Sequence, residues 1–177
     1  MPLNFEISIV SEKHIKYSKD IAIEIEIAAS VQGTGIAIRS AEYIESKIRS
    51  GQGIIALLDN KLAGFCYIEA WEGNKYVANS GLLVVELFRG KGLGRKIKNE
   101  AFALTRKLFP DSIFLGLTTS LAVMKINSEL GYAPVTFSEL TDDSEFWKGC
   151  ETCSYYDILF RTRRSNCLCT AMKYNPK

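Results

Sequence analysis

The sequence lacks several features that by themselves would define a class of protein. It contains no apolar run near the roughly 20 residues that a bilayer-spanning helix needs, and its start lacks the basic residues and the long apolar stretch of a secretory signal. It has 1 histidine, and its 22 basic and 20 acidic side chains leave a formal charge of only +2. We therefore expect a cytoplasmic protein with no membrane partner and no nucleic acid partner, because so small a charge gives no general attraction to polyanions.

The remaining composition is that of an ordinary globular chain. Hydrophobic residues make up 47% and charged residues 24% of the 177 residues, a balance that excludes general disorder and coiled coil. The length suits one domain and is short for two. The sequence has no internal repeat and no low-complexity linker, so we expect a single mixed α/β domain.

Hydrophobic periodicity predicts the order of helices and strands. Strands are expected at residues 5–10, 54–58, 62–71, 76–85, 113–117, 132–137 and 155–160, and helices at 14–30, 40–48, 93–109 and 121–130. The isoleucines of the first helix also alternate as in a strand, but their helical spacing is favoured. Turn residues at 59–60 and 73–74 join three successive strands, which predicts an antiparallel meander.

The most informative stretch is the glycine turn Arg89-Gly90-Lys91-Gly92-Leu93-Gly94, which follows an apolar strand and opens an amphipathic helix. Glycines at such a junction let the backbone approach a ligand closely, and the free N–H groups of the helix start favour a phosphate. A dinucleotide-binding fold would instead place its glycines after the first strand of a parallel βαβ unit. The turn therefore predicts a pyrophosphate site outside that class.

With Val84 and Val85 leading into it, the glycine turn resembles motif A of the GNAT superfamily of acyl-CoA-dependent N-acyltransferases, and the order of elements from Phe5 to Tyr132 is similar as well. The resemblance implies a single-domain α/β fold with a mixed, mostly antiparallel sheet flanked by helices. Its core would span residues 1–140, and residues 141–177 would form a cysteine-rich C-terminal extension packed on the same domain. Homodimers are common in this family, so a homodimer is expected.

The same resemblance implies an acetyl-CoA-dependent N-acetyltransferase, with acetyl-CoA as co-substrate and direct attack of a primary amine on the thioester. The backbone around the thioester would be that of Leu82, Leu83 and Val84. The pyrophosphate would be held by Arg89, Gly90, Lys91, Gly92, Leu93 and Gly94. A runner-up from another class is a GNAT-shaped module that binds acyl-CoA or a partner with little turnover.

The proton-transfer groups are less clear from the sequence. The family often has a tyrosine four residues before the position of Gly131, where this chain has Asn127. An amide cannot protonate the departing thiolate, which leaves three alternatives. Asn127 only hydrogen-bonds the sulfur, Tyr132 or another hydroxyl donates the proton instead, or the thiolate leaves toward water. The attacking ammonium also needs a base. Residues 76–85 contain no acid, and Glu69 on the preceding strand is the favoured candidate.

The acceptor half rests on scattered polar residues. Arg39 lies between the first two helices, where it would receive an acceptor carboxylate or else be an ordinary surface arginine. The adjacent hydroxyls of Thr118 and Thr119 end a strand similar to one in bacterial N-acetylglutamate synthases, and suit a carboxylate or the pantetheine amides. These residues favour a small-molecule amine acceptor, with an amino acid such as glutamate as the first candidate. The acidic run 138–143 leaves a polyamine or a protein lysine as alternatives.

Four of the five cysteines, Cys150, Cys153, Cys167 and Cys169, lie within 20 residues of one another. Disulfides are disfavoured in the expected compartment. Two cysteine pairs 13 residues apart suit a hairpin with residues 155–160 as one arm, and four thiolates can hold a structural zinc. The alternative is four unrelated buried thiols. Cys66, in a predicted strand, is expected to be a small buried apolar residue.

Overall fold

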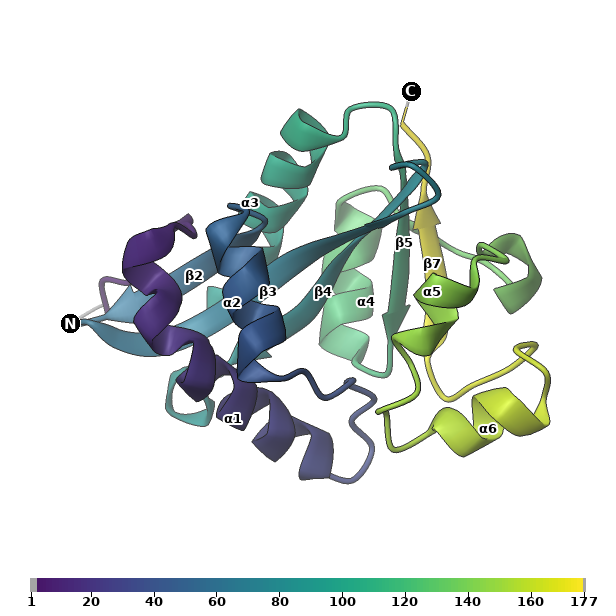
Figure 1. Ribbon diagram of the computed structural model, residues 1–177, viewed down its shortest axis with the longest axis horizontal. Coiled ribbons are helices and arrows are strands. Elements are labelled where there is room, and N and C mark those ends of the chain that lie inside the picture. The colour runs from purple at the N-terminus through teal and green to yellow at the C-terminus, as the bar shows by residue number, and fades with distance from the viewer. Residues whose placement is uncertain (1–2, 177) are drawn as a thin grey trace.

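The computed structural model describes residues 3–176, and its centre is a seven-stranded sheet in the order β1-β2-β3-β4-β5-β7-β6 (Figure 1). The strands are β1 (Glu6–Ile9), β2 (Gly53–Leu58), β3 (Lys61–Trp71), β4 (Tyr76–Val84), β5 (Ile113–Thr118), β6 (Ala133–Pro134) and β7 (Thr170–Tyr174). Only the β4–β5 pair is parallel among the strand pairs of the described residues. The predicted mixed, mostly antiparallel sheet is confirmed.

Helices cover both faces of this sheet (Figure 1). They are α1 (Ser18–Ser30), α2 (Ala41–Arg49), α3 (Leu93–Leu108), α4 (Leu121–Glu129), α5 (Ser144–Lys148) and α6 (Tyr156–Arg161), with short 3-10 helices at Glu12–Tyr17, Glu86–Phe88 and Phe137–Glu139. Helices α1 and α2 lie on one face, and α3 and α4 lie on the other. No helix within residues 3–176 is long and apolar enough to cross a membrane.

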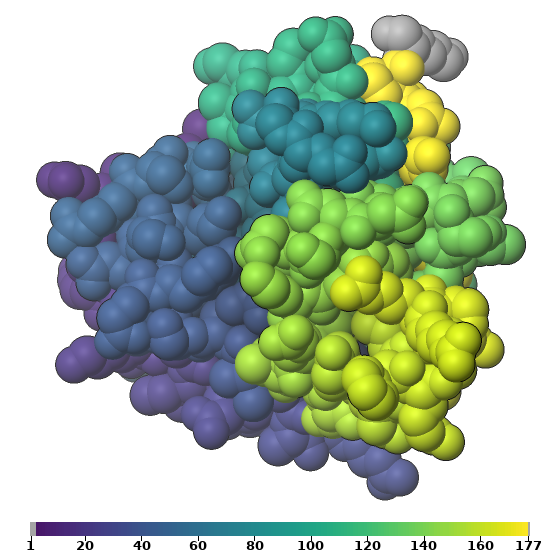
Figure 2. Space-filling model, turned by 45° about the vertical axis from the view of Figure 1, so that its right-hand side comes forward, coloured from purple at the N-terminus to yellow at the C-terminus, as the bar shows by residue number. Residues whose placement is uncertain are grey.

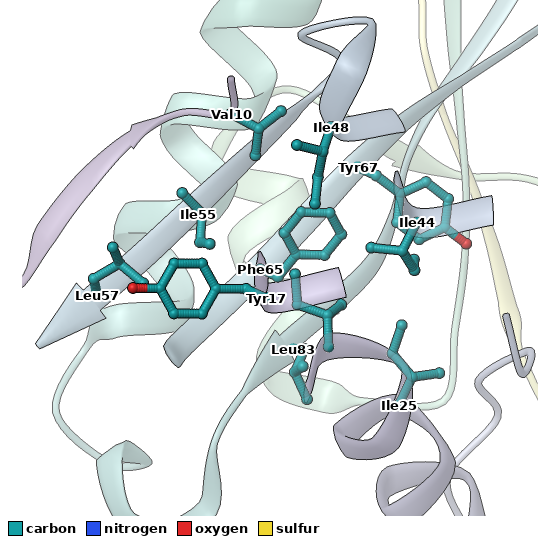
Figure 3. Packing of buried hydrophobic residues seen from close by; sticks show 11 residues of the cluster. Val10, Tyr17, Ile25, Ile44, Ile48, Ile55, Leu57, Phe65, Tyr67 and Leu83 are labelled. Atoms are coloured by element: carbon teal, nitrogen blue, oxygen red, sulfur yellow. The ribbon is translucent and has the colours of Figure 1, made fainter. Parts of the chain in front are cut away.

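The α1 and α2 layer is held by aliphatic side chains at helical spacing. Ile21 and Ile25 are fully buried, whereas Ile23 and Ile27, on the opposite side of α1, are more than half exposed (54% and 51%). This pattern confirms the helix over the strand-like alternation of the same residues. Figure 3 shows Ile25 of α1 and Ile44 and Ile48 of α2 packing with strand residues such as Phe65.

The other face is covered by α3. Leu93, Ile97, Ala101 and Leu104 recur every three or four residues and pack against the small and aliphatic side chains of β2 and β3, including Cys66. Cys66 is completely buried, as expected for a small apolar residue. Burial of this stripe fixes α3 on the sheet directly behind the glycine turn, because the turn and the helix are continuous in sequence.

Two predictions for the C-terminal part are wrong, and one strand was not predicted. Residues 155–160 lie in helix α6 instead of a strand, with Leu159 buried and Phe160 exposed. Residues 132–137 give only the two-residue strand β6, because Pro134 has no N–H to donate and the chain turns into a 3-10 helix at Phe137. Strand β7 (Thr170–Tyr174) was not predicted, although it lies between β5 and β6. The division at residue 140 stays a prediction.

The sheet opens between β4 and β5. The two strands pair only at Tyr76 with Ile113 and at Val77 with Phe114, and separate beyond that point. Gly81 causes part of this divergence, since the register of β4 against β3 shifts beside it and its φ is +59°. A Cβ on Gly81 would lie 2.3 Å from the ring of Tyr67. Only glycine fits there, and the bulge turns the end of β4 away from β5.

Candidate active site

A pocket of about 250 Å³ occupies the gap between the separated ends of β4 and β5. Its walls are residues 78–82 of β4, residues 115–120 at the end of β5, and Tyr67, Glu69 and Trp71, which alternate along β3. Residues 34–37 and Arg39 close it from the α1–α2 connection, and Lys98 of α3 closes it from the opposite face of the sheet. The pocket therefore passes through the sheet and is reached by groups from both helical layers.

The glycine turn lies at the end of β4, next to this gap. Gly90 and Gly92 have φ of +72° and +74°, and a Cβ on either would meet no atom within 4 Å, so both face open space. Gly92 is the N-cap of α3, and the first helical turn carries no acidic residue. Arg89 donates a hydrogen bond from Nε to the Val84 carbonyl at 3.0 Å, which fixes the turn on the strand. Unpaired N–H groups and a positive helix end are suited to a phosphate here.

Of the three residues predicted to lie around the thioester, one lines the pocket and two pack in the core. Leu82 lines the pocket, whereas the Leu83 side chain is buried against the α1 and α2 layer, and Val84 packs toward α3. Their alternation follows from the strand period of two.

Glu69 lines the pocket from the face of the sheet that α1 and α2 cover. Its Oε1 accepts a hydrogen bond from the Tyr43 hydroxyl of α2 at 2.5 Å and lies 3.8 Å from Nη2 of Arg39. The Glu69 and Arg39 side chains are only 14% and 13% exposed, so this ion pair is largely shielded from water. Burial raises the pKa of Tyr43, and the Glu69 carboxylate raises it further, so the phenol stays a donor to Glu69 at neutral pH.

Arg39 also connects the loop between α1 and α2 to the C-terminal segment. Its Nη1 and Nη2 each donate to the Gly149 carbonyl at 3.2 Å, and Thr152 donates from Oγ1 to the Ile38 carbonyl at 3.0 Å. The Gly33 amide donates to the Tyr155 hydroxyl at 2.7 Å. Figure 2 shows the green and yellow C-terminal residues lying against the blue and purple N-terminal ones. Arg39 is therefore not an isolated surface side chain.

The threonine pair lines the pocket at the end of β5. Thr119 Oγ1 accepts a hydrogen bond from the Gly35 amide at 3.0 Å, and Thr118 Oγ1 accepts from the Ser120 amide at 3.0 Å. Each hydroxyl keeps its own proton to donate to a ligand oxygen. The acidic run 138–143, the alternative recognition element, is not part of the pocket wall.

Asn127 lies behind the pocket and does not line it. It is 2% exposed, and its Nδ2 is 3.7 Å from the Met172 sulfur, while its Oδ1 has no hydrogen-bond partner among the described residues. Tyr132, the other residue considered as a proton donor, is also buried and its hydroxyl is unpartnered in the described chain. Burial raises the pKa of Tyr132, which makes it a weak acid.

The four C-terminal cysteines all line the pocket, and each is a free thiol. Zinc finds no support, because residues 3–176 contain no group of three or more histidine, cysteine or acidic side chains placed to hold a metal ion. The hairpin that was expected to gather them is a helix at its first arm. Burial raises the pKa of Cys150 to about 12 and also raises that of Cys169, so both thiols are protonated at neutral pH.

Sequence reasoning missed three residues of the site, and two of them carried a signal. Lys98 shares a helical face with Ala101 and Thr105, both buried, so a charge there breaks the apolar stripe. Gly81 interrupts an apolar strand, which often indicates a bulge. Tyr43 carried no signal, since its partner Glu69 lies 26 positions away.

The sequence profile of the acetyltransferase (GNAT) family matches residues 22–122, more than half of the chain. The chain therefore belongs to this family. The resemblance drawn from the glycine turn is confirmed, and with it the fold class. No curated protein matches the sequence.

Solved structures of other acetyltransferases share the fold. N-acetylglutamate synthase from Neisseria gonorrhoeae, complexed with coenzyme A and N-acetyl-glutamate, superposes with a TM-score of 0.67 at 19% identity, over 98% of this chain and 35% of that one. The Salmonella typhimurium protein yncA, with its cofactor acetyl-CoA, has a TM-score of 0.67 at 14% identity, covering 98% and 95% of the two chains. The ribosomal-protein-S18-alanine N-acetyltransferase of Escherichia coli has a TM-score of 0.60 at 12% identity, again covering 98% and 95%.

The chain thus spans only 35% of the N-acetylglutamate synthase that it resembles. The acceptors named for these relatives differ, a free amino acid in one and a protein alanine in another. At such low identity the likeness shows only the fold. The acceptor must be inferred from the residues of the pocket.

Proposed function

We propose that this protein transfers the acetyl group of acetyl-CoA to the amino group of a free amino acid. The observation that carries the proposal is the shielded pair of Glu69 and Arg39 in the pocket wall, 3.8 Å apart. Opposite charges side by side are complementary to a zwitterion, whose ammonium and carboxylate are also neighbours.

The donor would enter from the α3 side of the sheet. Its pyrophosphate would lie on residues 89–94, where glycines of positive φ leave open space beside the start of α3. The pantetheine arm would follow the gap between β4 and β5, with the thioester near Leu82, the pocket-lining member of the predicted set. A gap that passes through the sheet lets donor and acceptor meet from opposite faces.

The acceptor would bind from the α1 and α2 side. Its carboxylate would pair with the Arg39 guanidinium and accept hydrogen bonds from the hydroxyl of Thr118 or Thr119. Its ammonium would lie against Glu69. Glu69 accepts the ammonium proton, because only the neutral amine has a lone pair for the thioester carbonyl carbon. Tyr43 and Arg39 hold the Glu69 carboxylate in place for this step. Glutamate is the first amino acid to test.

The test uses matched acceptors that differ only in charge. Release of free thiol from acetyl-CoA is followed with each amino acid, with its carboxamide, and with spermidine and a lysine peptide. We expect release with an amino acid, glutamate first, and at least a tenfold lower kcat/KM, about 1.4 kcal/mol, for its carboxamide. Equal rates for acid and carboxamide, or release with spermidine or the peptide alone, would overturn the proposed acceptor.

The same assay decides between an enzyme of this specificity and the runner-up, an acyl-CoA-binding module. Tight coenzyme binding by calorimetry together with no acceptor-dependent thiol release across the panel would favour the module. The size of the pocket, about 250 Å³, supports a small molecule as acceptor.

A further inference from the structure

Lys98 is the most unusual charged residue of the molecule. It lies in the second turn of α3, faces the sheet and is only 3% exposed. Its Nζ donates a hydrogen bond to the Asn79 carbonyl at 3.3 Å and lies 5.8 Å from the centre of the Tyr132 ring. No carboxylate pairs with it within residues 3–176.

A buried ammonium with a single hydrogen bond destabilises the fold. Taking an ammonium out of water is unfavourable, as for any buried ion, and one carbonyl recovers only a small part of the lost hydration. The ionisable groups facing it are the Cys66 thiol from β3 and the Tyr132 phenol that follows α4. Burial lowers the pKa of Lys98, and the nearby Cys66 opposes this only partly. A methionine would fit the same position at lower cost, so packing does not explain the lysine.

The position of Lys98 relative to the pocket supplies an explanation. Lys98 lines the pocket from the α3 face, whereas Glu69 lines it from the α1 and α2 face. Lys98 is hydrogen-bonded to Asn79 of β4. The pairing of β4 with β5 ends at Val77, two positions before Asn79. The Nζ group therefore lies where the gap begins, on the side from which the donor would enter.

We propose that the Lys98 ammonium gives its proton to the coenzyme A thiolate as that thiolate leaves the acetyl group. This inference rests on the proposed function. It assigns to Lys98 the role of proton donor, which Asn127 cannot fill. Asn127 lies outside the pocket wall and carries no acidic proton, and the buried Tyr132 hydroxyl is a weaker acid than a lysine ammonium.

Glu69 takes one proton from the acceptor ammonium and passes it to water before the attack. The amine nitrogen then bonds to the carbonyl carbon, and Glu69 takes the second proton that the nitrogen gives up. The carbon–sulfur bond then breaks, and the sulfur keeps the bonding electron pair and takes one proton from Lys98. Lys98 is left as a neutral amine and regains a proton from water after the products leave. The lowered pKa of Lys98 brings its acidity closer to that of a thiol, which favours the transfer.

The first experiment replaces Lys98 by methionine in the full chain. We expect kcat with the best acceptor to fall at least about 100-fold, as for loss of a general acid. The coenzyme Kd should stay within threefold, and the urea midpoint should be unchanged or higher. Lys107→Met is the matched control, since Lys107 is an exposed lysine at the other end of α3. A kcat for Lys98→Met equal to that of Lys107→Met would overturn the proposal while leaving the proposed function intact.

The second experiment does not depend on turnover. Thiolate absorbance of bound coenzyme A is titrated against pH in the wild type and in Lys98→Met. We expect the bound thiol and Lys98 to titrate as a coupled pair in the wild type, so that the thiolate forms over a wider pH range than in Lys98→Met, where the thiol titrates alone. A bound thiol that titrates alike in both proteins would overturn the assignment even if no acceptor were found.

A pH profile separates catalysis from positioning. The wild-type kcat should decline on the alkaline side as Lys98 loses its proton, and this decline should be absent from the residual activity of Lys98→Met. Cys66→Ala should keep the decline, which shows that the neighbouring thiol is not its source. A decline that persists in Lys98→Met and disappears in Cys66→Ala would contradict the proposal.

Discussion

The proposed donor half and the proposed acceptor half of the site are built in different ways. The donor half is one continuous stretch, in which β4 leads through the glycine turn into α3. The proposed acceptor half is assembled from four separate segments, namely the loop of residues 34–39, the end of β3, the end of β5 and the C-terminal residues 149–169. A local sequence pattern can specify the first half, whereas only the folded chain brings the second half together.

The two halves also differ in what holds them. Burial of the apolar face of α3 positions the donor half, and glycine conformation shapes its turn. Hydrogen bonds between distant segments position the acceptor half, such as those from Arg39 to Gly149 and from Gly33 to Tyr155. Individual hydrogen bonds contribute about 1 kcal/mol each, so the acceptor half is the one that small changes should disturb.

The largest effect is expected from Glu69→Gln. The amide side chain would keep an oxygen for the Tyr43 hydroxyl but could not take a proton, so kcat should fall at least about 100-fold, or about 2.7 kcal/mol. Coenzyme affinity by calorimetry should not change, because Glu69 belongs to the acceptor half. Glu100→Gln, an exposed carboxylate change on α3, is the control. A kcat for Glu69→Gln within threefold of that control would remove Glu69 from the mechanism.

The next effect concerns Cys66 of β3, which is buried beneath helix α3 of the donor half. Burial raises its pKa from 9.0 to about 11, so between these values the unfolded chain ionises and the native chain does not. The stability present below pH 9 is therefore lost as the pH rises toward 11, by about 2 kcal/mol near pH 10.5. Urea unfolding below pH 9 and near pH 10.5 should show a loss about 2 kcal/mol smaller in Cys66→Ala than in the wild type and in Cys153→Ala, because Cys150 and Cys169 contribute to the loss in all three proteins. Equal pH slopes in all three proteins would contradict the burial of this thiol.

A third prediction tests the glycine turn. Gly92→Leu should weaken coenzyme binding at least tenfold, about 1.4 kcal/mol, because a side chain would project into the open space beside the phosphate site. Gly51→Leu is a matched control for backbone strain, since Gly51 has a φ of +68° and equally open surroundings far from the turn in sequence. Equal coenzyme affinity in the two folded variants would place the pyrophosphate elsewhere.

The same contrast explains which features the sequence predicted. The meander, α3 and the glycine turn depend on residues within one or two elements, so periodicity and turn residues sufficed for them. The helical packing of Ile21 and Ile25 was equally local. Glu69 was found because it alternates with Tyr67 and Trp71 on one strand, and all three line the pocket wall.

The failures arose where distant segments decide the structure. Helix α6 has one buried aliphatic residue, Leu159, and its six residues carry too little periodicity to separate helix from strand. Strand β7 is stabilised by β5 and β6 on its two sides, and neither neighbour is adjacent in sequence. The cysteine spacing was consistent with zinc, and all four cysteines do line one pocket, but the segment between the two pairs forms helix α6 instead of a hairpin arm, and residues 3–176 hold no group placed to bind a metal ion. The Tyr43–Glu69 contact likewise has no local pattern.

The smallest effect is expected from Tyr155→Phe, which tests the weaker half directly. The change removes the hydroxyl that accepts a hydrogen bond from the Gly33 amide at 2.7 Å, and leaves the ring in place. Loss of about 1 kcal/mol at this contact should loosen the loop that carries Arg39 and raise the acceptor KM about threefold to fivefold. Coenzyme affinity should be unchanged, because no donor-half residue takes part in the contact. Tyr156→Phe is the matched control, since Tyr156 also lines the pocket and is the adjacent tyrosine. If Tyr155→Phe instead weakened coenzyme binding and spared the acceptor KM, the division of the site into two independently held halves would be wrong.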